Sequence, residues 1–145
     1  MQRVAINGFG RIGRNVLRAW FEHPTQFNFE LVALNDIADV DTLVHLFKYD
    51  TTHGRFNGVV AVEQQADATF LNITAAHKSL RVQVLQCKQP RDLPWQQLNV
   101  DVVLECTGLF RSRSAATEHV HAGAKRVIIG AAPFDTVDAA IVYGV

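Results

Sequence analysis

Short apolar runs recur along the chain, and each stops at a polar residue or a glycine. Runs of this length bounded by turn residues are typical of buried strands. We therefore expect strands over residues 4–6, 31–34, 100–106, 126–130 and 139–143, the last running to the end of the chain.

Helical periodicity separates several of these runs. Apolar residues from Ile12 to Phe21 recur at helical spacing, and the pattern ends at Pro24. A second helix follows Asp39 or Asp41, either of which can cap it, and carries Leu43, Val44, Leu46 and Phe47. A third runs from Ser112 or Ser114 through Val120, with Gly123 just past its end.

The middle of the chain has a different pattern. Three strand-like pieces, at 59–62, 69–73 and 80–85, follow one another without a helical pattern between them. They predict a small antiparallel insertion. Elsewhere strands alternate with helices, which favours right-handed βαβ units and a mostly parallel sheet.

Composition restricts the function classes. The chain has 145 residues, 48% of them apolar, and Lys plus Arg equals Asp plus Glu at 14 each. We expect one folded domain over residues 1–145, with no signal peptide and no membrane span. Zero net charge gives no electrostatic reason to expect nucleic-acid or membrane binding. We expect a cytoplasmic protein with free thiols; a single Cys87–Cys106 disulfide is the alternative.

One motif carries specific chemistry. The segment from Gly8 to Gly13 fits G-x-G-x-x-G, follows a predicted strand and opens a predicted helix. Gly8 permits the tight turn, Gly10 lets backbone approach a pyrophosphate, and Gly13 allows close helix–strand packing. Amides near Arg11 and Ile12, at the positive end of the helix, would bind the phosphates. The alternative is a glycine-rich turn without a ligand.

Asp36 completes the dinucleotide-binding pattern. It ends the second predicted strand, about 20 residues beyond the glycines, where an acidic residue accepts hydrogen bonds from the adenosine ribose. The same charge would repel a 2′-phosphate, so the sequence favours NAD over NADP. A solvated Asp or a helix cap is the alternative. Together the motifs predict a Rossmann-type, doubly wound fold, with Thr107 and Gly108 at the cofactor-facing end of another strand.

Other residues with reactive or polar side chains suggest no second site. Arg14 and Arg18 are interpreted as a polar or salt-bridged helix face, and Trp20 and Trp95 as packing residues. None of the six histidines has a Ser or Cys partner or metal-ligand spacing, so we expect no metal. Cys106 lies in an apolar strand, where we expect a buried and unreactive thiol. Lys88 is next to Cys87, and its positive charge would lower the pKa of the Cys87 thiol slightly. Neither cysteine is a predicted catalytic residue.

Several ordered segments resemble the glyceraldehyde-3-phosphate dehydrogenase family, which includes erythrose-4-phosphate dehydrogenase. The likeness covers essentially the whole chain. The segments that carry it are residues 4–14, 34–36, 48–56, 105–110 and 122–127.

The resemblance implies an assignment of cofactor contacts. Arg11 and Ile12, within the loop of Gly8, Phe9, Gly10 and Gly13, would meet the pyrophosphate, and Asp36 the adenosine ribose. Lys88 replaces the arginine that the family often has near the adenine. Thr107, Gly108 and Phe110 would line the adenine and nicotinamide path. One departure is Gly130, where the family usually has Ser or Thr, so a hydroxyl contact is lost.

The resemblance also implies an activity that this chain does not complete. The family oxidises a phosphosugar aldehyde through a cysteine thiohemiacetal and hydride transfer to NAD. Its catalytic cysteine, catalytic histidine and substrate phosphate sites follow the segment that ends at Val145. We therefore expect a catalytic domain absent from this chain, an inactive fragment, and a homotetramer for the full-length protein. Phosphosugar would bind only with the missing domain.

Two substrate branches and two other functions stay open. Residues 137–145 look more like the erythrose-4-phosphate branch and residues 107–110 more like the glyceraldehyde-3-phosphate branch; the longer terminal match favours erythrose 4-phosphate. A free-standing NAD-binding or redox-sensing module is the alternative function. A fragment of another Rossmann enzyme, such as a semialdehyde or homoserine dehydrogenase, is disfavoured by residues 53–56.

Overall fold

The fold is a twisted sheet with helices on both faces. The structure, a computed structural model, describes residues 1–50, 53–76, 78–133 and 135–141. In these residues a seven-stranded sheet has the order β5-β6-β7-β2-β1-β8-β9. Its central pairs β2–β7, β1–β2, β1–β8 and β8–β9 are parallel, whereas β5–β6 and β6–β7 are antiparallel. The expected mostly parallel sheet is confirmed.

The elements agree closely with the apolar pattern. The sheet strands are β1 (Gln2–Asn7), β2 (Phe29–Asn35), β5 (Val59–Gln65), β6 (Ala68–Ala75), β7 (Lys78–Leu85), β8 (Val102–Glu105) and β9 (Arg126–Ile129). The helices are α1 (Arg11–Glu22), α2 (Val40–Lys48), α3 (Arg113–His121) and the short 3-10 helix η1 (Pro90–Asp92). A small pair, β3 (Tyr49–Asp50) with β4 (Gly54–Arg55), was not expected from the pattern.

Local capping explains where two helices begin. The Asp39 side chain accepts a hydrogen bond from the Thr42 N–H at 2.9 Å, so Asp39 and not Asp41 caps α2. The Ser112 hydroxyl accepts from the Ala115 N–H at 3.1 Å and caps α3. Both caps satisfy amide donors that would otherwise lack a partner in the first helical turn.

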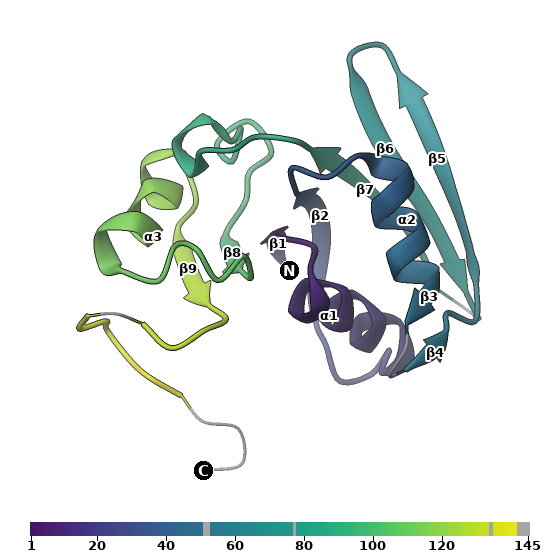
Figure 1. The fold of residues 1–145 in the computed structure, drawn as a ribbon, viewed down its shortest axis with the longest axis horizontal. Coiled ribbons are helices and arrows are strands. Elements are labelled where there is room, and N and C mark those ends of the chain that lie inside the picture. Colours follow the sequence, from purple (N-terminus) through teal and green to yellow (C-terminus); the bar gives the residue numbers. More distant parts are fainter. Residues whose placement is uncertain (51–52, 77, 134, 142–145) are drawn as a thin grey trace.

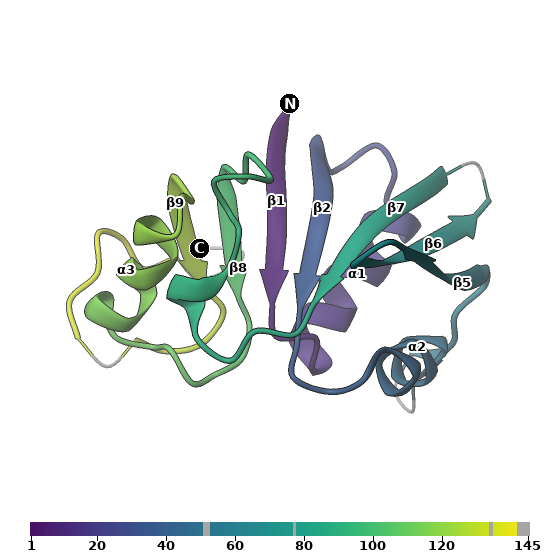
Figure 2. The ribbon, with the colours of Figure 1, turned by 90° about the horizontal axis from the view of Figure 1, so that it is seen from above.

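Strand alternation distributes the core between two layers. In β1, Val4 and Ile6 join the core under α1 and α2, whereas Ala5 joins a second core with Trp95 on the opposite face. Figures 1 and 2 show α1 and α2 beside the β2–β7 part of the sheet and α3 beside β8 and β9. Helices therefore cover both faces, which confirms the doubly wound arrangement.

The expected antiparallel insertion is confirmed in β5, β6 and β7, and because β7 pairs in parallel with β2, the insertion extends the main sheet. One other expectation needs correction. The strand expected over 139–143 is wrong for residues 139–141, which form no strand, and Ile141 is 91% exposed. Residues 142 and 143 lie outside the described residues. A short apolar run forms a strand only where a neighbouring strand edge supplies backbone partners.

Candidate cofactor-binding site

The glycine loop joins β1 to α1 in a tight turn. Gly8 has a φ of +95° and donates its N–H to the Asn35 carbonyl at 2.7 Å. A Cβ atom on Gly8 would lie 2.7 Å from the backbone nitrogen of Thr107, and one on Gly13 would lie 2.3 Å from the Gly8 carbonyl oxygen. Both positions therefore require glycine, one for the turn and one for close helix–strand packing.

The start of α1 is suited to an anion. Gly10 precedes the helix, and a Cβ atom there would meet no described atom within 4 Å. Among the described side chains none caps α1, and its first turn carries no acidic residue. The first amide donors are thus left for a ligand at the positive end of the helix, beside the exposed residues Arg11 and Ile12. This open cradle fits the pyrophosphate of a dinucleotide.

Asp36 is tied to the glycine loop. Its Oδ2 accepts a hydrogen bond from the Phe9 N–H at 2.7 Å, and its Oδ1 accepts from the Ala38 N–H at 2.9 Å. The carboxylate is half-buried and does not cap α2, because Asp39 does. A carboxylate oxygen can accept more than one hydrogen bond, so both ribose hydroxyls could still be bound here.

The turn after β8 lies against the glycine loop. Thr107 packs next to Gly8, and its Oγ1 accepts from the Leu109 N–H at 3.0 Å. Gly108 has a φ of +76° and is exposed, and Phe110 is half-buried. β1 and β8 are adjacent, and the strand order reverses between them, which is where ligands bind in open α/β sheets.

Lys88 follows β7 at the same edge of the sheet. It is exposed, and the preceding residue, Cys87, is held by the Asn35 side chain. Figure 2 shows the segment after β7 passing the edge where β1, β2 and β8 end. The tertiary structure thus brings every expected site residue to one edge of the sheet, although they come from four separate parts of the chain.

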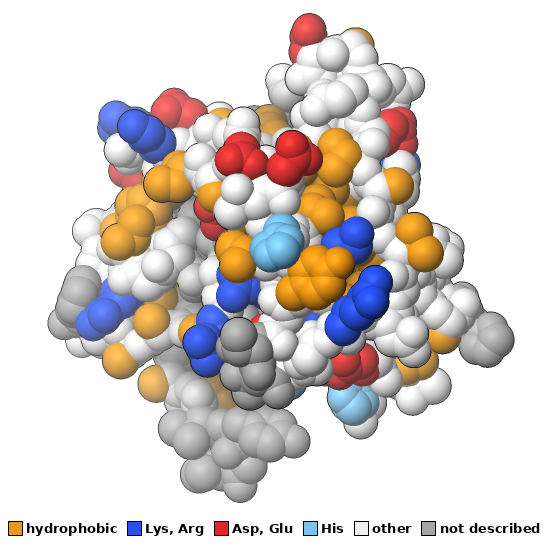
Figure 3. Space-filling view, turned by 45° about the vertical axis from the view of Figure 1, so that its right-hand side comes forward, with side chains coloured by type: hydrophobic (Ala, Val, Ile, Leu, Met, Phe, Trp, Pro, Cys, Tyr) orange, Lys and Arg blue, Asp and Glu red, His pale blue; other side chains and the backbone are white. Residues whose placement is uncertain are grey.

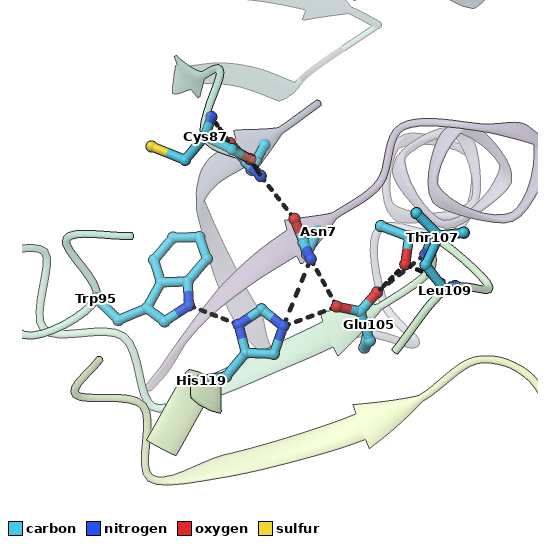
Figure 4. A network of polar contacts seen from close by, with 8 residues as sticks. Asn7, Cys87, Trp95, Glu105, Thr107, Leu109 and His119 are labelled. Atoms are coloured by element: carbon cyan, nitrogen blue, oxygen red, sulfur yellow. Dashed lines mark hydrogen bonds and ion pairs between the residues drawn. The ribbon is translucent and has the colours of Figure 1, made fainter. Parts of the chain in front are cut away.

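A buried polar network beneath this edge was not expected from the sequence. Glu105 is 1% exposed and accepts hydrogen bonds from the side chains of Asn7 and His119 (Figure 4). Trp95, interpreted as a packing residue, donates its indole N–H to His119 at 3.0 Å. A polar residue at the end of an apolar strand, as at Asn7, Asn35 and Glu105, is the sequence signal that could have indicated it.

The thiols are unreactive by environment. Burial and the neighbouring Glu105 carboxylate raise the pKa of Cys106 to about 11, which agrees with the expected inert cysteine. Burial, followed by the charge of Asp92, also raises the pKa of Cys87, so the lowering expected from Lys88 is wrong. Both cysteines are free, and the alternative of a disulfide between them is wrong as well.

Arg18 is not part of a polar helix face. It is 4% exposed, and its Nη2 donates to the carbonyls of Phe47 at 3.0 Å and Gly54 at 2.7 Å. Its guanidinium also lies over the rings of Phe47 and Phe56. Arg14 donates to the Phe9 carbonyl at 3.2 Å. Through these hydrogen bonds Arg18 connects α1 to α2 and to the β3–β4 pair.

Gly130 lies where β9 ends, close to the turn after β8. Its N–H donates to the Glu105 carbonyl at 2.8 Å. A Cβ atom there would lie 3.2 Å from that carbonyl oxygen and 3.7 Å from Cγ2 of Ile12. A Ser or Thr at this position would therefore add its hydroxyl beside the start of α1.

The remaining surface features are mixed. On the face drawn in Figure 3, basic, acidic and apolar side chains are interspersed. Within the described ranges, no group of three or more His, Cys, Asp or Glu residues is arranged to hold a metal ion. No helix in the described part of the chain is long and apolar enough to cross a membrane.

Comparison with known proteins agrees with the geometry. The family profile described as "Glyceraldehyde 3-phosphate dehydrogenase, NAD binding domain" matches residues 2–113. The chain is 51% identical over 143 residues to the chromosomal glyceraldehyde-3-phosphate dehydrogenase of Cupriavidus necator and 48% identical over 143 residues to the glyceraldehyde-3-phosphate dehydrogenase of Pseudomonas aeruginosa. Each alignment covers 99% of this chain and 40% of the relative, so the chain spans about 40% of the length of these relatives.

The site, the fold and the family match agree on one cofactor. The glycine loop, the uncapped start of α1 and Asp36 lie together at the point where the strand order reverses, and this arrangement fits a dinucleotide. The matched profile is that of an NAD-binding domain from a family of oxidoreductases. The chain therefore belongs to the glyceraldehyde-3-phosphate dehydrogenase family and corresponds to the N-terminal, NAD-binding domain of its members.

Proposed function

We propose that this domain holds NAD for the oxidation of a phosphosugar aldehyde. The observation that carries the proposal is the hydrogen bond from the Phe9 N–H to Asp36, because it joins the two halves of the dinucleotide motif. The proposed cofactor contacts are Gly8, Phe9, Gly10, Arg11, Ile12 and Gly13 at the pyrophosphate, Asp36 at the adenosine ribose, Lys88 near the adenine, and Thr107, Gly108 and Phe110 along the adenine and nicotinamide path.

The proposed substrate is glyceraldehyde 3-phosphate. Both relatives described above are named glyceraldehyde-3-phosphate dehydrogenase, and this supports glyceraldehyde 3-phosphate over erythrose 4-phosphate. Erythrose 4-phosphate remains the second candidate because residues 137–145 resemble that branch. Rates measured with both sugar phosphates on a full-length protein containing this chain distinguish them: the better substrate has the higher kcat/KM.

The chemical step requires residues beyond this chain. We propose that a second domain supplies a cysteine that attacks the aldehyde to form a thiohemiacetal, and that bound NAD accepts the hydride. The role of the present residues is to bind and orient the cofactor. The 145-residue chain alone should therefore show no dehydrogenase activity with either sugar phosphate. Turnover that survives removal of contaminating full-length enzyme would contradict the proposal that a second domain supplies the catalytic residues.

The assembly and location follow from the same family assignment. We propose a homotetramer for the full-length protein and a cytoplasmic location, the latter supported by two free thiols. A free-standing redox sensor is the alternative. The raised thiol pKa values count against it, because a sensor cysteine is usually an accessible thiolate of low pKa.

The first test is a calorimetric titration of the chain with NAD and, separately, with NADP. Binding of NAD with clearly weaker binding of NADP is the expected result, because Asp36 repels a 2′-phosphate. Equal affinity for the two cofactors would contradict the assignment of Asp36. Failure of both to bind would mean that the glycine loop and Asp36 do not form a working site in this chain.

A further inference from the structure

A chain of buried side chains connects three neighbouring strand ends. Asn35 at the end of β2 donates from Nδ2 to Oδ1 of Asn7 at 2.7 Å, and Asn7 at the end of β1 donates from Nδ2 to Oε1 of Glu105 at 2.6 Å. All three side chains are at most 3% exposed. In Figure 4 the side chain of Asn7 points toward Glu105 and His119.

The Asn35 end of this row holds the segment that leads to Lys88. Its Oδ1 accepts the Cys87 N–H at 2.9 Å, and its Nδ2 donates to the Cys87 carbonyl at 2.9 Å. Both backbone groups of one residue are therefore satisfied by one side chain. This fixes the backbone after β7 relative to β1 and β2.

The Glu105 end holds the turn after β8. Its Oε2 accepts from the Thr107 N–H at 3.0 Å and from the Thr107 hydroxyl at 2.7 Å. The same hydroxyl oxygen accepts from the Leu109 N–H at 3.0 Å. Because Thr107 packs directly on Gly8, the carboxylate sets the position of this turn against the glycine loop.

His119 completes the set of donors to Glu105. The indole N–H of Trp95 can only donate, so Nδ1 of His119 accepts and its proton lies on Nε2. Nε2 then donates to Oε1 of Glu105 at 2.7 Å. Burial alone would raise the pKa of Glu105, but the hydrogen bonds from His119, Thr107 and Asn7 outweigh burial and lower it. The carboxylate is thus ionised and saturated with donors.

We propose that Glu105 is a positioning residue for NAD binding: it holds the turn of Thr107 against the glycine loop before the cofactor arrives. It does so without touching the cofactor, because its side chain is buried. An acceptor-only group is needed, since donors face both of its oxygens. The inference rests on NAD binding at this edge, as proposed above.

The test compares Glu105→Gln with the unsubstituted 145-residue chain. Glutamine replaces one carboxylate oxygen by an NH₂ group, which cannot accept a hydrogen bond. Either the donors of Asn7 and His119 at Oε1 or those of Thr107 at Oε2 therefore lose their acceptor. We expect the Kd for NAD to rise at least tenfold. Backbone amide hydrogen exchange should show lost protection at Thr107 and Leu109, with protection retained at Val103 and Leu104 in β8.

A matched control separates positioning from general destabilisation. Ile73→Val trims a fully buried side chain of β6 on the β6–β7 part of the sheet, remote from the cofactor edge. It should lower the melting temperature while leaving the Kd for NAD and the protection of Thr107 and Leu109 unchanged. If its Kd rises as much as that of Glu105→Gln, the effect is general and the proposal is overturned.

Three further outcomes complete the test. An unchanged Kd in folded Glu105→Gln overturns the proposal while leaving NAD binding intact. If Glu105→Gln does not fold, Thr107→Val takes its place. Removing the Thr107 hydroxyl leaves the Leu109 N–H without its acceptor and should raise the Kd for NAD threefold to tenfold. An unchanged Kd in Thr107→Val overturns the proposal. If the unsubstituted chain binds no NAD, the proposed function of this site fails first and the positioning role with it.

Discussion

The Asp36 carboxylate accepts a hydrogen bond from the Phe9 backbone at 2.7 Å, so one side chain both orders the glycine loop and faces the cofactor edge. We predict that Asp36→Asn weakens NAD binding by roughly 10- to 100-fold, because a charge-assisted hydrogen bond contributes about 1.5–3 kcal/mol. NADP binding should weaken less, since the repelling charge is gone. Calorimetry with both cofactors measures the two changes.

The matched control for this prediction is Asp39→Asn. Asp39 is exposed and caps α2, and asparagine caps helices as well as aspartate does. Its NAD affinity should equal that of the unsubstituted chain. An Asp36→Asn variant that keeps the original preference for NAD over NADP would contradict the role assigned to this carboxylate.

Substitutions of two glycines in the loop should affect different properties, one the stability of the domain and the other its affinity for NAD. A Cβ atom on Gly13 would lie 2.3 Å from the Gly8 carbonyl oxygen, so Gly13→Ala should cost about 1–3 kcal/mol of the free energy of unfolding. A Cβ atom on Gly10 meets open space, so Gly10→Ala should cost less stability but weaken NAD binding by filling the phosphate cradle. Denaturant melts and calorimetry measure the two effects. Equal losses of stability would contradict the packing argument.

The glycine at position 130 gives a prediction of improved binding. Gly130→Ser restores a hydroxyl beside the start of α1 and should tighten NAD binding about 2- to 10-fold, the contribution of one neutral hydrogen bond. The backbone must first accommodate a Cβ atom 3.2 Å from the Glu105 carbonyl oxygen. Gly130→Ala is the control, because alanine adds the same Cβ atom but no hydroxyl. Equal affinities of the Ser and Ala variants would count against a hydroxyl contact.

Arg18 should matter for stability and not for the cofactor. Arg18→Met leaves the carbonyls of Phe47 and Gly54 without their donor, and we expect a loss of about 1–3 kcal/mol in the free energy of unfolding. Arg81→Met is the control, because Arg81 pairs with Glu63 at the surface, where solvent screens the two charges and an ion pair contributes little to stability. NAD affinity should be unchanged in both variants. Equal stability losses in thermal or chemical melts would contradict the difference in burial.

The buried carboxylate predicts sensitivity to acid. The folded pKa of Glu105 lies below its ordinary value of 4.5. Its contribution to stability is therefore complete above that value and is lost as the pH falls through the lower, folded pKa. We expect the melting temperature to fall as the pH drops below this ordinary value of 4.5, and to fall less steeply in Glu105→Gln, which has no proton to gain there. Parallel acid profiles for the two proteins would contradict this.

Much of the fold could be predicted from local patterns. The short apolar run of β1, the helical spacing of α1 and the Asp39 cap are properties of neighbouring residues, so they are visible in the sequence. The run at 139–143 shows the limit of this reasoning. It has the composition of a strand, but residues 139–141 pair with no other strand in the described chain. Pairing depends on a partner that composition does not reveal.

By itself, the sequence determined the dinucleotide motif, because Gly8, Gly10, Gly13 and Asp36 act through backbone conformation and charge at spacings that can be counted along the chain. Only the tertiary structure decided the network beneath it. Asn7 and Glu105 are separated by 98 positions, and His119 is brought to them by the packing of α3 on the opposite face of the sheet. A buried polar group is stable only when its partners are in place. The polar strand ends are visible in the sequence, but their partners come from distant strands and helices, so no local pattern shows which residues pair.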